Sequence, residues 1–174
     1  VLADMFAWPE GDGVLLELDP SRRDDILRRL SMYKLRAQAV IEDVSGQRHA
    51  LYAADRFNGA VADPRFPEGA LGWRKLGPDT APNGASVYAA HRLVVGVPDL
   101  ARDAKPDEVF ALEALLEELH GVDFQKGCFI GQENVSRMKR RATTRKKFCP
   151  VVFDGAVPAY GAAVVAGAAE LGEI

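Results

Sequence analysis

The octapeptide Lys126-Gly127-Cys128-Phe129-Ile130-Gly131-Gln132-Glu133 is the most informative stretch of this 174-residue sequence. It follows a Gly-Val-Asp turn and precedes residues 134–137, which are compatible with a helix. A cysteine beside a lysine and just before a helix start has two neighbours that favour thiolate, a cation and the positive end of the helix dipole. The two glycines permit tight turns and the close approach of a ligand. The alternative is that Cys128 is a small buried apolar side chain, and the spacing alone leaves both interpretations open.

The overall composition is that of an ordinary globular protein. The chain is 48% hydrophobic and 27% charged, which excludes a disordered, collagen-like or disulfide-scaffold protein. Its length predicts one domain, or one domain and part of another. The apolar runs are too short to span a bilayer, and no export leader opens the sequence. Because Cys128 and Cys149 cannot form a disulfide framework, we expect a reducing compartment.

Charge is concentrated in one segment. Residues 137–147 hold seven basic residues and no acidic one, whereas the rest of the chain holds 15 basic and 25 acidic residues. An acidic body with one basic segment can present that segment to an anion such as phosphate, a nucleic-acid backbone or a carboxylate-rich tail. A solvated basic surface is the equally open alternative.

Hydrophobic periodicity and turn residues predict an α+β fold with antiparallel sheets and covering helices. Hairpins are expected from residues 1–8 with 14–18 and from 38–44 with 48–53, followed by a short strand at 70–75, a loop at 77–84, and helices at 19–33, 85–94 and 106–119. The last of these helices carries the clearest apolar stripe, with Gly121 as its stop.

A change in sequence pattern near residue 147 predicts a boundary. Residues 1–147 form the α+β region, and residues 148–174 begin an all-β element with short strands at 151–153 and 162–165. The chain opens inside an apolar strand without a methionine, and its last residues are expected to begin a further strand. We therefore expect a fragment of a longer protein.

The octapeptide resembles the signature of the YgfZ family of folate-binding, iron–sulfur cluster assembly proteins. This family is similar in fold to the aminomethyltransferase (T-protein) of the glycine cleavage system. Weaker marks in the same order extend the resemblance to essentially the whole chain: Val1–Asp4, Arg92–Pro98, Leu119–Phe124 and Pro150–Gly155.

The resemblance implies a T-protein-like fold, incomplete at its N-terminus, followed by the start of a C-terminal β-barrel. It implies an accessory protein that binds tetrahydrofolate and serves the assembly, repair or insertion of [4Fe–4S] clusters into client enzymes, tRNA-methylthiolating enzymes among them. Cys128 is then the reactive group. The residues expected to bind folate are Lys126, Gly127, Gly131, Gln132, Glu133, Arg92 and Arg137. The implied partners are client enzymes or cluster carriers, in the cytoplasm or, in a eukaryote, the mitochondrial matrix.

The cysteine count restricts the cluster chemistry. An iron–sulfur cluster takes about four thiolates, whereas this chain offers Cys128 and Cys149. We interpret Cys149 as structural. His49, His91 and His120 are isolated and lack metal-ligand spacing, so no resident metal site is expected. Any cluster contact must therefore be transient, shared with a partner or completed by other ligands.

Two other functions compete with this interpretation. The first is a folate-dependent aminomethyltransferase, and any enzymatic activity of the chain stays open. The aminomethyltransferase relatives carry a glutamate in the segment that corresponds to Arg92–Pro98, and this sequence has none there. The second is nucleic-acid binding by residues 137–147, which the lack of interleaved aromatic residues disfavours. We expect that segment to meet the polyglutamate tail of a folate or an acidic partner, with an affinity that falls as salt rises.

Overall fold

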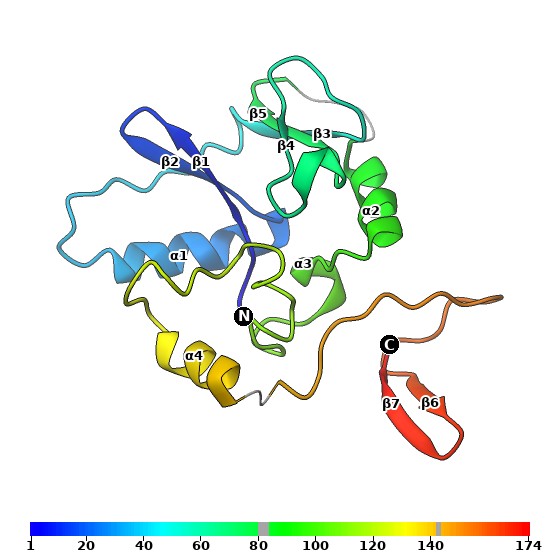
Figure 1. Cartoon of the computed structure of the whole chain (residues 1–174). Helices are drawn as coiled ribbons and strands as arrows, with labels where there is room; N and C mark the ends of the chain where they lie inside the picture. Colours follow the sequence, from blue (N-terminus) through cyan, green and yellow to red (C-terminus); the bar gives the residue numbers. More distant parts are fainter. Residues whose placement is uncertain (80–83, 142–143) are drawn as a thin grey trace.

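A computed structural model of the chain describes residues 1–79, 84–141 and 144–174 (Figure 1). The strands are β1 (Phe6–Glu10), β2 (Gly13–Glu17), β3 (His49–Ala53), β4 (Val61–Ala62), β5 (Trp73–Gly77), β6 (Ala163–Ala166) and β7 (Ala169–Glu173). The helices are α1 (Arg23–Tyr33), α2 (Gly84–Val95), α3 (Leu100–Asp103) and α4 (Gln132–Arg141), with 3-10 turns η1 (Pro20–Arg22) and η2 (Pro67–Gly69). The α+β class with antiparallel pairing is confirmed. None of the described helices is long and apolar enough to cross a membrane.

The first hairpin and the first helix are observed, but the first strand begins at Phe6, and residues 1–5, which were predicted to be part of it, form no strand. β1 pairs antiparallel with β2 around a turn at Gly11-Asp12. The carboxylate of Asp19 then accepts a hydrogen bond of 2.9 Å from the Ser21 amide, which caps the turn that leads into α1. Only Ile26 of α1 is fully buried.

The second predicted hairpin is wrong. Residues 38–44 form no strand, and β3 pairs instead with β5 in a sheet of order β3-β5-β4. The reason is burial: β3 places Leu51 and Tyr52 in the interior, whereas no residue of 38–44 is buried and Val40 is 81% exposed. The predicted strand at 70–75 is observed slightly later, as β5.

The predicted helix at 85–94 is α2, and it contacts β3. Below it lies the main apolar cluster, in which Leu71, Val97 and Leu119 are buried together. Part of the loop predicted at 77–84 lies outside the described residues, which resume at Gly84.

The helix predicted at 106–119 is also wrong, because this segment is a succession of turns. Its amide hydrogen bonds reach back three, four or five residues in succession, and Asp107 and Leu115 have φ angles of 62° and 58°, which no α-helix contains. A regular helix would align Ala114 with the charged residues 117 and 118. The reversal at Leu115 instead buries Ala114 completely and leaves those glutamates to form ion pairs.

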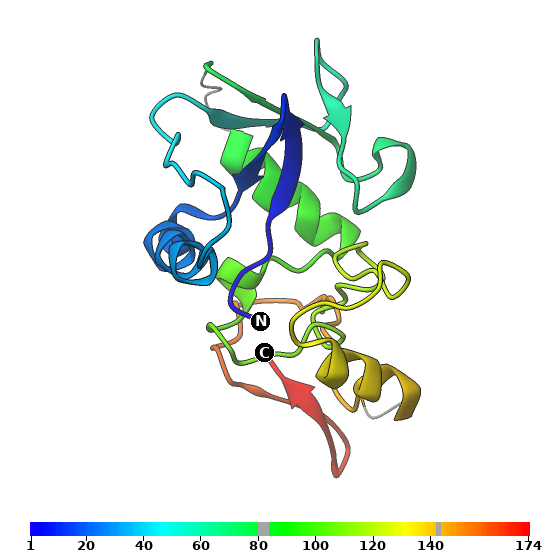
Figure 2. The same cartoon turned by 90° about the vertical axis from the view of Figure 1, so that its left-hand side faces the viewer.

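The C-terminal residues run along the outside of this turn region and end in a hairpin (Figures 1 and 2). The Phe148 amide donates to the Glu113 carbonyl at 3.0 Å, and β6 pairs with β7. The predicted strand at 162–165 is thus observed one residue later. Residues 151–153 form no strand, because Val152 is 97% exposed and nothing pairs with it among the described residues. The domain boundary and the barrel stay predictions.

Candidate functional site

The octapeptide forms an exposed turn that leads into α4. Cys128 is exposed, and α4 begins four residues later at Gln132. Gly127 and Gly131 have φ angles of 89° and 85°, with no atom within 4 Å of the position a Cβ would take. Both glycines therefore provide the backbone freedom and the open space that the sequence predicts. The Nζ of Lys126 lies 5.1 Å from the centre of the Phe129 ring, a cation–π contact at the same turn.

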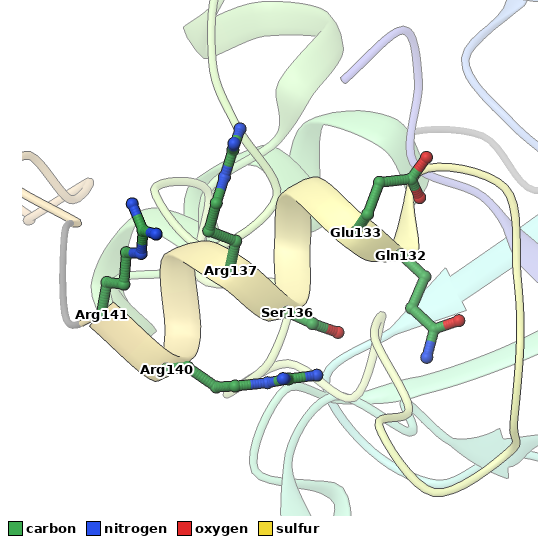
Figure 3. A pocket seen from close by; sticks show the side chains of 6 residues that line it. All are labelled: Gln132, Glu133, Ser136, Arg137, Arg140 and Arg141. Atoms are coloured by element: carbon green, nitrogen blue, oxygen red, sulfur yellow. The ribbon is translucent and has the colours of Figure 1, made fainter.

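The polar face of α4 surrounds a shallow hollow of about 450 Å³ (Figure 3). Its lining residues form two rows with a spacing of four along the helix: Gln132, Ser136 and Arg140 in one row, and Glu133, Arg137 and Arg141 in the other. Three residues that the sequence predicts as binding residues, Gln132, Glu133 and Arg137, thus share one surface. Ser136, Arg140 and Arg141 were not predicted as site residues. A prediction of the whole of α4 would have included them, because their helical spacing places them on the same face.

Lys126, Gly127, Cys128 and Gly131 precede α4 and do not line this hollow, and Arg92 lies apart from both the hollow and the octapeptide. It is only 5% exposed, and its two terminal nitrogens donate to the carboxylate of Asp103 at 2.6 and 2.9 Å. One of them also donates to the carbonyl of Val97 at 3.2 Å. These contacts tie α2 to α3, and no residue of the octapeptide takes part in them.

A second, larger concavity of about 1240 Å³ lies between the β1–β2 hairpin, α1 and β3. It shares no lining residue with the hollow on α4. Phe6 and Tyr88 contribute aromatic rings, and Asp4 contributes a carboxyl group. Burial, together with the charge of Asp99, raises the pKa of Asp4 above its ordinary value of 3.8. We call this concavity the hairpin groove.

A buried charge network that sequence reasoning missed supports the hairpin groove. Asp63 is fully buried and accepts hydrogen bonds from Arg65 and Arg74, and Arg74 also pairs with Glu17 of β2. The two guanidinium groups lie 4.8 and 4.0 Å from the centre of the Phe6 ring. Because these residues come from separate strands and a turn, no local sequence motif identifies them. The Asp63-Pro64-Arg65 triplet is recognisable in the sequence only as a turn.

The described residues contain no group of three or more His, Cys, Asp or Glu side chains placed to hold a metal ion. His91 bonds to the hydroxyl of Tyr52 at 2.5 Å, and His120 to the carbonyl of Pro64 at 2.9 Å. Both histidines thus have structural partners.

Comparison with known proteins first identifies the class of proteins to which the chain is similar. No family model matches the chain, but the curated proteins to which it is similar are iron–sulfur cluster assembly factors. The human mitochondrial iron–sulfur cluster assembly factor IBA57 is 33% identical to it, over 92% of the chain and 51% of the human protein. The mouse protein is 32% identical over 84% of the chain and 47% of its own length. The homologue from Pyricularia oryzae is 29% identical over 88% and 45%.

Two facts limit the comparison and correct one expectation. The chain spans about half the length of the curated relatives it matches. The names of these relatives describe them as mitochondrial, which does not support the cytoplasm as the expected compartment. They agree with the matrix alternative stated for a eukaryotic source.

Proposed function

We propose that this chain belongs to an accessory protein for iron–sulfur cluster assembly and that Cys128 is the residue that meets the cluster. The observation that carries the proposal is the similarity to cluster assembly factors over 92% of the chain. The exposure of the Cys128 thiol in an open, glycine-flanked turn supports it, because a cluster-handling thiol must reach a partner.

The cluster itself is cargo that a partner shares with this chain. A cluster takes about four thiolates, and the chain has two cysteines, both exposed. With one thiolate from Cys128, the remaining ligands must come from a carrier or a client enzyme. We further propose [4Fe–4S] enzymes, including those that methylthiolate tRNA, as clients. The matrix is the compartment that the relatives favour if the source is a eukaryote.

Tetrahydrofolate is proposed as a ligand of the hairpin groove. A folate is a flat heteroaromatic ring with a carboxylate tail, and ligands of this kind bind in concave sites lined by aromatic side chains and a few polar groups. The groove provides the Phe6 and Tyr88 rings, a half-buried carboxyl at Asp4 for the ring's donors, and Lys34 for the tail. These residues fit the ligand better than the shallow hollow on α4, so the octapeptide is left to the cluster. A titration with tetrahydrofolate should show Asp4→Asn binding at least about fivefold more weakly, with Cys128→Ser unchanged. Equal affinity for both variants would refute this placement.

The decisive experiment for the function is rescue in a host that lacks its own family member. The intact gene product, its Cys128→Ser variant and its Cys149→Ser variant would be compared for the activity of a [4Fe–4S] enzyme and for tRNA methylthiolation. We expect rescue by the wild type and Cys149→Ser, and a loss of at least about tenfold with Cys128→Ser. Cys149 is the matched control because it is the other exposed thiol. Rescue by Cys128→Ser, or none by soluble wild type, would overturn the proposal.

A further inference from the structure

Three arginines on α4 lack acidic partners. Arg137, Arg140 and Arg141 are exposed, and none of them forms an ion pair with any residue in 1–79, 84–141 or 144–174. The one hydrogen bond from their guanidinium groups is a long one of 3.4 Å, from Arg137 to the Asn134 side chain. Glu133 lines the same hollow and still pairs with none of them. This arrangement leaves three fixed positive charges open to solvent.

The neighbouring lysines behave differently. Lys139 pairs with Glu117 and also lies 4.0 Å from the centre of the Phe124 ring, and Lys147 pairs with Glu118. These contacts hold α4 and the residues after it to the turn region at 110–124. The lysines thus attach the helix to the body, while the arginines line the hollow, with Arg137 and Arg141 on one side of α4 and Arg140 on the other (Figure 3). The two kinds of cation thus have separate roles in α4 and the residues that follow it.

We propose that the arginine face of α4, defined by Arg137, Arg140 and Arg141, is the docking surface for an acidic protein that carries a thiolate-bound iron–sulfur cluster to Cys128. The inference rests on the proposed function, and it names the kind of partner. Guanidinium groups match carboxylates in paired hydrogen bonds, and a cluster held by thiolates is itself anionic. The arginine face begins one turn after the octapeptide, so a protein bound there is adjacent to the exposed thiol.

Two other anions fit this face less well. The glutamate tail of a folate would extend from the hairpin groove, which shares no lining residue with the hollow on α4. A single-stranded nucleic acid is bound through stacking on aromatic rings, and residues 132–141 contain none. An acidic protein surface needs neither feature.

The test measures how fast Cys128 reacts with charged peptides. The intact chain carries Cys149→Ser, so that Cys128 is its one remaining thiol. Each of two synthetic peptides has a cysteine activated as a 2-thiopyridyl disulfide, flanked by glutamates in one and by glutamines in the other. The Cys128 thiolate attacks the peptide sulfur, a mixed disulfide forms, and the released 2-thiopyridone reports the rate. We expect the acidic peptide to react about tenfold faster at low salt, and the advantage to fall below about twofold at 0.5 M salt.

Matched variants assign the effect to α4. Arg137→Gln/Arg140→Gln should slow the acidic peptide by about fivefold and leave the glutamine peptide within about twofold. Arg28→Gln/Arg36→Gln removes the same charge from exposed residues in and just after α1 and should leave both rates within about twofold. Circular dichroism verifies that all variants are folded.

Three results would overturn the inference: equal rates for the two peptides, an equal loss in the α1 control, or stronger competition by a single-stranded oligonucleotide than by polyglutamate. The assay contains neither cluster nor folate. A failure here therefore leaves the proposed function standing, and a failed rescue by wild-type protein leaves this result standing.

Discussion

At the scale of single residues, the carboxylate of Asp63 organises the largest buried charge network. It is fully buried and accepts hydrogen bonds of 2.9 and 2.8 Å from Arg65 and one of 2.9 Å from Arg74. Burial by itself would raise the pKa of Asp63, but these hydrogen bonds and the two positive charges outweigh burial and hold the pKa below its ordinary value of 3.8. The Asp63 carboxylate thus serves as the counter-charge of Arg65 and Arg74.

Replacing Asp63 by asparagine should lower the free energy of unfolding by about 3 kcal/mol at pH 7, because the buried Arg65 guanidinium loses its counter-charge and Arg74 keeps only Glu17. Because the pKa of Asp63 is lowered, its ionised form stabilises the fold at pH values above the ordinary 3.8. This stabilisation is lost as the pH falls through the pKa of the folded state. The difference from wild type should therefore shrink below about pH 4. Urea unfolding measures both effects. Asp12→Asn, in an exposed turn, is the control, and an equal loss there would contradict the account.

Asp4 in the hairpin groove has the opposite dependence on pH. Its pKa is raised, chiefly by burial, so its contribution to stability is present below the ordinary value of 3.8 and is lost as the pH rises through the folded-state value. Asp4→Asn should therefore gain stability relative to wild type between about pH 4 and pH 7. Urea midpoints at several pH values test this expectation. A difference that does not vary with pH would show that Asp4 has an ordinary pKa in the folded protein.

At the scale of elements, local signals predicted those parts of the fold that local contacts determine. The turn at Gly11-Asp12, the Asp19 cap and the apolar spacing of α2 are all readable from neighbours in the chain. The failures have longer-range causes. The partner of β3 is set by burial against β5, and a helix-like apolar spacing at 106–119 is satisfied by turns that bury Leu112, Ala114 and Leu119.

In the candidate site, too, the sequence predicted the residues that lie close together in the chain and missed those that only the fold brings together. The octapeptide and Arg137 are recognisable because they lie within one stretch of sequence, and α4 places Gln132 and Glu133 of the octapeptide on one surface with Arg137. The hairpin groove and Asp63 were not predicted, because their residues come from distant segments that only the fold brings together.

The contact between the turn at Gly72 and β3 offers a test at this scale. A Cβ at Gly72 would lie 2.5 Å from the Tyr52 hydroxyl and 2.7 Å from the Ala53 carbonyl, at a φ of 84°. Gly72→Ala should therefore cost about 3 kcal/mol in the free energy of unfolding, from both steric overlap and backbone strain. Gly155 has a φ of 91° but open space around it, so Gly155→Ala should cost only about 1 kcal/mol. Equal urea midpoints for the two variants would contradict the packing of this sheet.

At the scale of the whole molecule, two separate surfaces serve two proposed tasks. The hairpin groove is lined by residues of the β1–β2 hairpin, α1 and β3, and the hollow on α4 shares none of them. Figures 1 and 2 show α4 apart from the β1–β2 hairpin and β3. The relatives are about twice the length of the matched region. We infer that folate and cluster need not touch the same side chains.

The chain by itself should not retain a cluster. Anaerobic reconstitution with iron and sulfide, followed by desalting, is expected to leave less than about 0.1 cluster per chain, because two exposed thiols supply half of the usual ligand set. Iron and sulfide analysis measures the result. A stable cluster retained at one per chain, or at one per two chains, would contradict the need for a partner.

The most direct measurement is native mass spectrometry of the intact chain mixed anaerobically with a carrier protein that holds an iron–sulfur cluster. We predict a complex of one chain, one carrier and one cluster. It should be present with wild type and Cys149→Ser, and reduced at least about tenfold with Cys128→Ser. A cluster-containing complex that forms equally well with Cys128→Ser would contradict the central role of this thiol, as would a complex that never contains the cluster.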